Sequence, residues 1–255
     1  MALLQVSDVS KRFGGLLAVS GLTFTVKQAE IISIIGPNGA GKTTLFNLLT
    51  GIYRPTSGKI LFDGREITGF KTHQAARQGM GRTFQRTTVF GRESVLDNVM
   101  IGHTLHLKTG VWGTLFRTAF ARQEERRVKE KAREVLSFVG LSEKEKLPAG
   151  SLTEEAQKRL SIAMVLATDP KLLLLDEPTG GVNLEEIGGL IDLMEKIRKA
   201  GITICLIEHK MRLVMRISDR IIVLNYGVNI AEGTSAEIAC NGEVIKAYLG
   251  ARHVA

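Results

Sequence analysis

Cysteine and long apolar runs are scarce in this sequence of 255 residues. Only two cysteines occur, Cys205 and Cys240, and they are too few and too isolated for a disulfide framework or a paired-cysteine zinc site. We therefore expect a reducing compartment. The start of the chain, MALLQVSDVSKRF, has no apolar stretch of signal-peptide length, and the longest apolar runs elsewhere, 31–35 and 172–175, are a handful of residues. The sequence predicts a protein that does not enter or cross a membrane by itself.

The net charge is positive, but basic and acidic residues are mixed. The formal charge is +8 and the isoelectric point is about 9.6, which permits attraction to nucleic acid, anionic lipid or nucleotide. The stretch RQEERRVKEKARE at 122–134 carries acids among its bases, which is more typical of the solvated face of a helix than of a nucleic-acid contact. We therefore expect no nucleic-acid partner.

Two kinds of apolar pattern predict two kinds of β-structure. LLQVSDV, LTFTVKQ and GKILFDG alternate apolar and polar residues near glycines, which indicates antiparallel strands and turns. EIISIIG, KLLLLDEP and ITICLIEH are continuously apolar, as in strands buried on both faces of a parallel sheet. RIIVLNYGVNIAEG, residues 220–233, indicates a hairpin.

Helical spacing appears between these strands. KTTLFNLLTG at 42–51 and the segment 185–200 have helical periodicity, and helical signals dominate from 83 to 167. They are clearest over 117–140, where apolar residues fall on one face and charges fill the other. The apolar face consists of Val128, Ala132, Val135, Leu136 and Val139. The order of elements predicts an α/β fold with a mostly parallel sheet, an N-terminal antiparallel β-subdomain and an inserted helical subdomain.

The segment GPNGAGKT at 36–43 fits the phosphate-binding pattern of glycine, four residues, glycine, lysine and threonine. It follows a predicted strand and opens a predicted helix, as the mechanism requires. Glycines let backbone N–H groups converge on phosphate oxygens, and the helix N-terminus adds partial positive charge. Lys42 would neutralise the β- and γ-phosphates, and the Thr43 hydroxyl would bind Mg²⁺. The predicted nucleotide-binding residues of this segment are Gly36, Pro37, Asn38, Gly39, Ala40, Gly41, Lys42, Thr43 and Thr44.

Two adjacent acids end the second buried strand. Four leucines bury that strand and place Asp176 at its carboxyl end, beside the phosphate loop, where it can hold Mg²⁺ through water. Glu177, one residue on, points to the other side and can polarise the attacking water as general base. The alternative is a loop acid that caps a helix. Together the two segments predict a P-loop NTPase core that uses ATP and Mg²⁺.

In these motifs the sequence resembles the ATP-binding subunits of ABC transporters, over essentially its whole length. GPNGAGKTT matches the phosphate loop of that family, and LLLLDEP matches its aspartate-glutamate strand. The resemblance implies that His209, in LIEHK, is the switch histidine and that Gln85, in RTFQ, binds magnesium or the lytic water. It also implies that Phe13, in KRFGGLLAV, stacks on adenine.

The resemblance further implies a division of the chain and a set of partners. A catalytic core would comprise 1–84 and 168–255, with a helical signature subdomain at 85–167. ATP would be hydrolysed between this chain and a second ABC ATPase subunit, identical or different. Transmembrane permease subunits would bind the pair at the cytoplasmic face of the inner or plasma membrane, and a periplasmic or extracellular substrate-binding protein would act indirectly.

Within the family, the sequence is similar to importers of branched-chain or other hydrophobic amino acids. The features are RFGGLLAV near the start, RTFQ followed by an insertion at 103–120, and GGVN after the acidic pair. Asn183 stands in GGVN where the common form has aspartate.

The signature segment of the family is altered in this chain. Its usual form is leucine-serine-glycine-glycine-glutamine, whereas this chain has Leu152, Thr153, Glu154, Glu155 and Ala156. In the family dimer this segment faces the γ-phosphate bound by the opposite subunit, and like charges about 4 Å apart repel by roughly 4 kcal/mol at an effective dielectric near 20. This interpretation predicts a heterodimer in which the site completed by this segment hydrolyses poorly. Alternatively the segment begins a helix, with its acids favourable to the helix dipole and its side chains pointing away.

Two other functions fit parts of the sequence. A protein acting on DNA or ribosomes would suit the basic charge, but such relatives generally carry coiled-coil insertions or two cassettes in one chain, which this sequence lacks. A regulatory subunit that binds nucleotide without hydrolysis would suit the altered signature, although the intact Glu177 and His209 argue against it.

Overall fold

The computed structural model describes residues 2–83, 89–103, 119–183 and 185–250. The chain forms two compact units. Unit 1 comprises Met1–Arg82, Lys171–Pro178 and Met194–Ala255, and unit 2 comprises Thr83–Pro170 and Thr179–Leu193. The division passes through one helix, α7 (Ile187–Lys199).

Unit 1 contains a six-stranded sheet in the order β10-β9-β3-β8-β7-β6, in which only the β9–β10 pair is antiparallel. Every residue of β3, β7 and β8 is buried, which confirms that the three continuously apolar segments are interior strands. The strands are β3 (Ile31–Ile35), β6 (Met80–Arg82), β7 (Leu172–Asp176), β8 (Thr203–Ile207), β9 (Arg220–Asn225) and β10 (Val228–Gly233).

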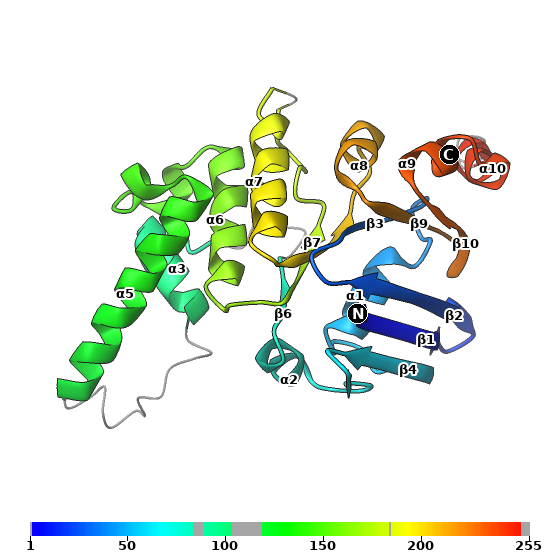
Figure 1. The fold of residues 1–255 in the computed structure, drawn as a ribbon, viewed down its shortest axis with the longest axis horizontal. Coiled ribbons are helices and arrows are strands. Elements are labelled where there is room, and N and C mark those ends of the chain that lie inside the picture. Colours follow the sequence, from blue (N-terminus) through cyan, green and yellow to red (C-terminus); the bar gives the residue numbers. More distant parts are fainter. Residues whose placement is uncertain (1, 84–88, 104–118, 184, 251–255) are drawn as a thin grey trace. The chain divides into compact units, whose positions relative to one another are not determined.

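A second sheet of unit 1 is antiparallel, in the order β2-β1-β4-β5, as the alternating segments predict. Helix α1 lies between the two sheets (Figure 1), and its apolar side chains share one core cluster with residues of both. The elements are β1 (Ala2–Phe13), β2 (Leu16–Lys27), α1 (Lys42–Leu49), β4 (Ser57–Phe62), β5 (Arg65–Glu66) and α2 (Thr72–Arg77).

Three short helices near the C-terminus cover the opposite face of the six-stranded sheet. Because side chains alternate along a strand, Ile34 points into the α1 cluster and Ile35 points into a second cluster formed with these helices. The helices are α8 (Met211–Ile217), α9 (Ser235–Ala239) and α10 (Gly242–Gly250). Neither they nor β6 follow from the sequence patterns, since these segments are short. The helices are stabilised by packing on the sheet, and β6 is stabilised by pairing with β7.

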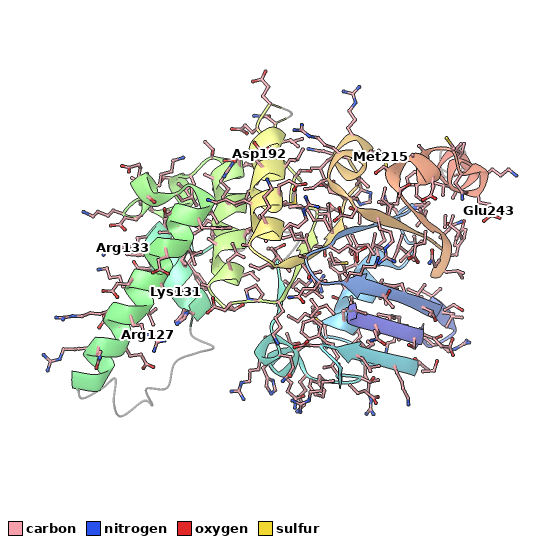
Figure 2. The ribbon with its side chains drawn as sticks, viewed as in Figure 1. Arg127, Lys131, Arg133, Asp192, Met215 and Glu243 are labelled. Atoms are coloured by element: carbon pink, nitrogen blue, oxygen red, sulfur yellow. The ribbon has the colours of Figure 1, made fainter. Side chains whose placement is uncertain are left out.

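Unit 2 is helical in its described part. Helices α3, α5 and α6 pack against one another (Figure 1), and two short 3-10 turns precede α6. All five apolar residues predicted for one face of α5 are buried, whereas Arg127, Lys131 and Arg133 extend from the helix (Figure 2). The mixed charges of 122–134 are therefore the solvated face of a helix. The elements are α3 (Val95–Gly102), α5 (Ala119–Val139), the turns Ser142–Lys144 and Ala149–Ser151, and α6 (Glu154–Leu166).

No helix within the described ranges is long and apolar enough to cross a membrane.

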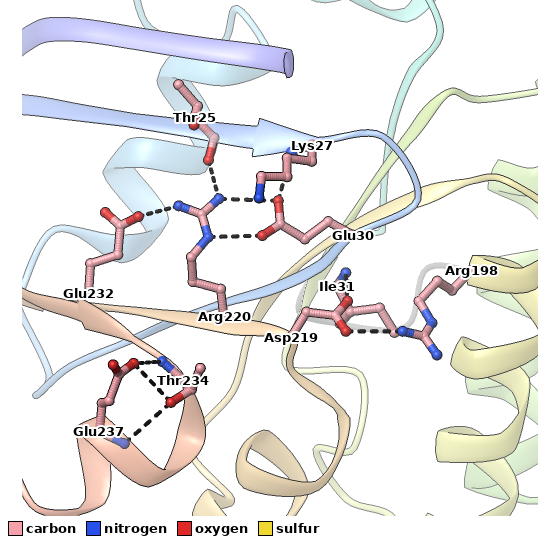
Figure 3. A network of polar contacts seen from close by, with 10 residues as sticks. All are labelled: Thr25, Lys27, Glu30, Ile31, Arg198, Asp219, Arg220, Glu232, Thr234 and Glu237. Atoms are coloured by element: carbon pink, nitrogen blue, oxygen red, sulfur yellow. Dashed lines mark hydrogen bonds and ion pairs between the residues drawn. The ribbon is translucent and has the colours of Figure 1, made fainter. Parts of the chain in front are cut away.

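An ion pair between a half-buried arginine and a buried carboxylate links the two sheets of unit 1. Arg220, on β9, donates to both carboxylate oxygens of Glu30 at 2.9 and 3.1 Å, and also to Glu232 and to the carbonyl of Thr25 (Figure 3). The Glu30 side chain is only 8% exposed. A buried carboxylate needs such compensation because it has lost its hydration.

Replacing Arg220 with methionine is expected to lower the free energy of unfolding by about 3–5 kcal/mol, because Glu30 would remain buried without its cation. Urea unfolding followed by circular dichroism measures this loss. Arg198→Met is the control, because its partner Asp219 is 42% exposed and such pairs contribute under about 1 kcal/mol. Equal losses in the two variants would contradict the prediction.

Candidate active site

The phosphate loop joins β3 to α1 and is tightly packed from behind. Gly36 has a φ of 150°, and a Cβ there would collide with the carbonyl of Leu224 on β9. Gly41 has a φ of 98°, and a Cβ would lie 2.6 Å from the carbonyl oxygen of Ala18 on β2. Only glycine fits these two positions, which fixes the path of the loop.

The first turn of α1 is suited to an anion. Its N-cap is Gly41, which has no side chain to accept from the free N–H groups, and the first turn carries no acid. Thr43 is exposed at this end of the helix. Free N–H groups and the helix dipole together favour a phosphate at this position.

The Lys42 side chain folds back over the loop. Its Nζ donates to the carbonyl oxygens of Gly36 at 2.7 Å and Pro37 at 2.9 Å, and the residue is buried. Burial lowers the pKa of Lys42, while the negative charges of Glu177 and Asp176 raise it in part. A phosphate would supply the full countercharge, since those two neighbours do not offset the loss of hydration.

Asp176 ends β7 and is buried, with 3% of its side chain exposed. Its Oδ2 accepts from Nη2 of Arg82 at 2.9 Å. The sequence motifs did not predict this ion pair, because the two residues are 94 positions apart and meet only through the pairing of β6 with β7.

Glu177 directly follows β7 in the left-handed region, with a φ of 49°. Its N–H donates to the carbonyl of Ile207 at 2.9 Å, which holds this strained residue at the end of β8. Its Oε1 lies 3.0 Å from Nε2 of His209, and both side chains are partly exposed. The structure thus brings together a carboxylate and an imidazole, within hydrogen-bond reach, beside the phosphate loop.

Two further residues support this arrangement, and the sequence analysis assigned a role to neither of them. Glu208 is buried, and its Oε2 accepts from the N–H groups of His209 at 2.8 Å and Lys210 at 3.1 Å. Tyr248, on α10, accepts a hydrogen bond from the amide of Gly36, and burial raises the pKa of its hydroxyl. Glu208 therefore fixes the loop after β8, and Tyr248 contacts the start of the phosphate loop from α10.

The oxygen groups at this site fit a magnesium ion shared with a nucleotide. Mg²⁺ prefers oxygen ligands and is held by one or two protein groups plus phosphates rather than by a full protein cage. Thr43 offers a hydroxyl, and Asp176 offers a carboxylate. Among the residues that the structure describes, no cluster of three or more histidine, cysteine or acidic side chains could hold a metal ion by itself.

Phe13 lies at the end of β1 and is 39% exposed. Its ring meets the ring of Tyr53 edge to face at 5.1 Å, and Nζ of Lys11 lies 4.9 Å from its centroid. Tyr53 follows α1 and donates from its backbone N–H to the carbonyl of Asn47. An exposed aromatic ring at this position could accept an adenine base by stacking.

The altered signature segment belongs to unit 2, where it begins α6. Thr153 is the N-cap, and its hydroxyl accepts from the Ala156 amide at 3.3 Å. Glu155 forms an ion pair with Arg159 one turn later, and the carboxylate of Glu154 lies where a Cβ on Gly181 would be. Leu152 and Ala156 are buried. The carboxylates of Glu154 and Glu155 therefore both contact residues of unit 2.

Gln85 lies outside the described residues, and so does most of the predicted insertion at 103–120. Within unit 1 the structure brings Lys42, Asp176, Glu177 and His209 to one place on the phosphate loop side of the sheet. The fold and this site define a nucleotide-hydrolysing protein of the P-loop class.

Comparison with known proteins gives the family. Residues 19–180 match the ABC transporter family model, and residues 228–254 match a second model, for branched-chain amino acid ATP-binding cassette transporters. The chain is 46% identical over 249 residues to the high-affinity branched-chain amino acid transport ATP-binding protein BraF of Pseudomonas aeruginosa, covering 97% of this chain and 98% of that protein. It is 43% identical over the same length to LivG of Escherichia coli K12.

A solved structure agrees with this result. The crystal structure of the ADP conformation of an ATP-binding cassette of an ABC transporter matches with a TM-score of 0.86 at 31% identity, covering 98% of this chain and 99% of that one. The chain belongs to the ABC transporter family of ATP-binding cassettes. It is an ABC ATPase, the ATP-binding subunit of a transporter.

Proposed function

We propose that this chain hydrolyses ATP to drive uptake of branched-chain or other hydrophobic amino acids. The observation that carries the proposal is the likeness over nearly the whole chain to BraF and LivG, together with the match of residues 228–254. The contact between Glu177 and His209 supports hydrolysis rather than nucleotide binding alone.

The chemistry follows from the positions of the side chains. Free N–H groups of α1 and the ammonium of Lys42 bind the phosphates and stabilise charge that develops on the γ-phosphate. Glu177 accepts the proton of the attacking water, and His209 orients its carboxylate. Thr43 and Asp176, with Gln85, would hold Mg²⁺, which would neutralise charge on the β- and γ-phosphates. Phe13 stacks on the adenine.

The chain acts as half of an ATPase pair bound to transmembrane permease subunits, peripheral to the cytoplasmic face of the membrane, and a substrate-binding protein delivers the cargo. Residues 85–167 form the signature subdomain, and 1–84 with 168–255 form the catalytic core. No nucleic acid takes part.

Reconstitution with the cognate membrane subunits, partner ATPase and binding protein tests this function. Vesicles loaded with ATP are expected to take up labelled leucine, isoleucine or valine, and ATP hydrolysis should rise when the loaded binding protein is added. Hydrolysis that responds to another class of cargo, and to none of these amino acids, would contradict the proposed cargo while leaving the ATPase assignment intact.

From the two acids of the signature segment we predict a heterodimer whose two ATP sites hydrolyse ATP at unequal rates. If Glu154 and Glu155 reduce closure on the partner's nucleotide, replacing both with glycine is expected to raise ATP hydrolysis by the isolated subunit about tenfold, because the repulsion from the γ-phosphate is removed. Glu130 and Glu134, exposed on α5, give the control pair as alanine variants. A glycine variant with intact helix content and no increase in ATP hydrolysis would contradict the prediction.

A further inference from the structure

A buried arginine forms an ion pair with the acid that we assign to the metal. Arg82 is the last residue of β6, and its Nη2 donates to Oδ2 of Asp176 at 2.9 Å. The two side chains are 8% and 3% exposed, so solvent screens this pair little. The pairing of β6 with β7 sets the contact, because Arg82 lies opposite Leu174, two residues before Asp176.

The other side of the guanidinium contacts the helix that carries the phosphate loop. Nη1 of Arg82 donates to Oδ1 of Asn47 at 2.6 Å, and its Cζ lies 5.5 Å from the centroid of the Phe46 ring. Thr50 Oγ1 is 3.5 Å from Nη1. Arg82 therefore connects the carboxyl end of β7 to α1 through directed contacts on both sides.

This arrangement has a consequence for a divalent cation at Asp176. Arg82 compensates the charge of the buried carboxylate, and it uses Oδ2 to do so. A metal ion bound to the same carboxylate meets the positive charge of Arg82, and Lys42 is a second cation close by. Opposition between like charges is strong where water is excluded.

We propose that Arg82 is a positioning residue that orients Asp176 and lowers the affinity of the site for a divalent cation. The proposal rests on the role of Asp176 in the proposed function. The metal and Arg82 share the carboxylate of Asp176, so metal binding weakens the ion pair between Arg82 and Asp176, and the ion pair weakens metal binding. Metal binding then depends on the nucleotide phosphates, which supply the additional negative charge.

The test is a titration of the full chain with Mn²⁺, followed by electron paramagnetic resonance, in the presence of ADP. Arg82→Met is expected to bind Mn²⁺ about tenfold more tightly than the unmodified chain, because one buried positive charge is removed. Arg82→Lys, which keeps the charge, should stay within about threefold, and so should Arg77→Met, an exposed arginine on α2. Affinity for ADP in EDTA should change little in all three.

The outcomes separate this proposal from the proposed function. A folded Arg82→Met variant with unchanged or weaker Mn²⁺ binding overturns the role of Arg82 and assigns it to structure alone. Asp176→Asn that binds Mn²⁺ as tightly as the unmodified chain removes Asp176 from the metal site, which is a failure of the proposed function instead.

A second measurement covers the case in which Arg82→Met does not fold. In the unmodified chain labelled with ¹⁵N-arginine, the guanidinium signal of Arg82, assigned from the Arg82→Lys spectrum, is expected to shift when Mg²⁺ is added to the ADP-bound protein. ADP in EDTA should leave that signal nearly unchanged. A signal that does not respond to Mg²⁺ overturns the proposal.

Discussion

Replacing Glu177 with glutamine is expected to reduce ATP hydrolysis by about 10²–10⁴-fold, because a carboxamide cannot accept the proton of the attacking water. The replacement is nearly the same size and retains a carbonyl oxygen, Oε1, which can still accept from His209. The left-handed backbone at this residue and its N–H bond to Ile207 do not depend on the charge. Nucleotide affinity should therefore stay within a few fold.

Steady-state hydrolysis by the assembled transporter, with nucleotide affinity measured separately, checks this result. Glu185→Gln is the matched control, because Glu185 is an exposed carboxylate outside the site, and it should hydrolyse ATP at the normal rate. A Glu177→Gln variant that hydrolyses ATP at a rate near normal would show that another group takes the proton.

Replacing Lys42 with methionine is expected to weaken ATP binding by about 10²–10⁴-fold, since each of two charge-assisted hydrogen bonds to phosphate oxygens contributes about 1.5–3 kcal/mol. The loss should be larger for ATP than for AMP, because Lys42 faces the β- and γ-phosphates in the proposed complex. Burial already lowers the pKa of Lys42, so the folded protein holds this charge at a cost.

The free energy of unfolding without nucleotide should consequently change by no more than about 1 kcal/mol, because removal of the buried charge offsets the lost bonds to Gly36 and Pro37. Calorimetric titration measures the affinity, and urea unfolding measures the stability. Lys59→Met, an exposed lysine on β4, is the control and should bind ATP normally. Unchanged ATP affinity in Lys42→Met would remove the phosphate loop assignment.

The sequence was sufficient for elements whose stabilising pattern is local. The interior strands can be recognised as apolar runs because both of their faces are covered. The buried face of α5 can be recognised because apolar residues recur at helical spacing from Val128 to Val139. The phosphate loop is a contiguous motif. Short elements that exist only through packing, namely β6 and α8 to α10, gave no such pattern.

The signature segment has one feature that the local sequence predicts and one that only the tertiary structure produces. Thr153 and the two glutamates that follow have the composition of a helix start, and the structure has α6 beginning there with Thr153 as its N-cap. The pair of Glu155 with Arg159 is local, since the two residues are one helical turn apart, whereas the contact of Glu154 with the loop at Gly181 could be found only in the folded unit. The effect of these acids on a neighbouring nucleotide remains the subject of the glycine experiment.

The amino-acid order alone determined the class of fold and the segments proposed to bind phosphate, because those features are encoded by neighbours along the chain. The tertiary structure decided which distant groups meet: Glu177 with His209, and Arg82 with Asp176. These contacts depend on which strands are adjacent and on their register, and a strand that is apolar on both faces has no alternation from which its register can be read.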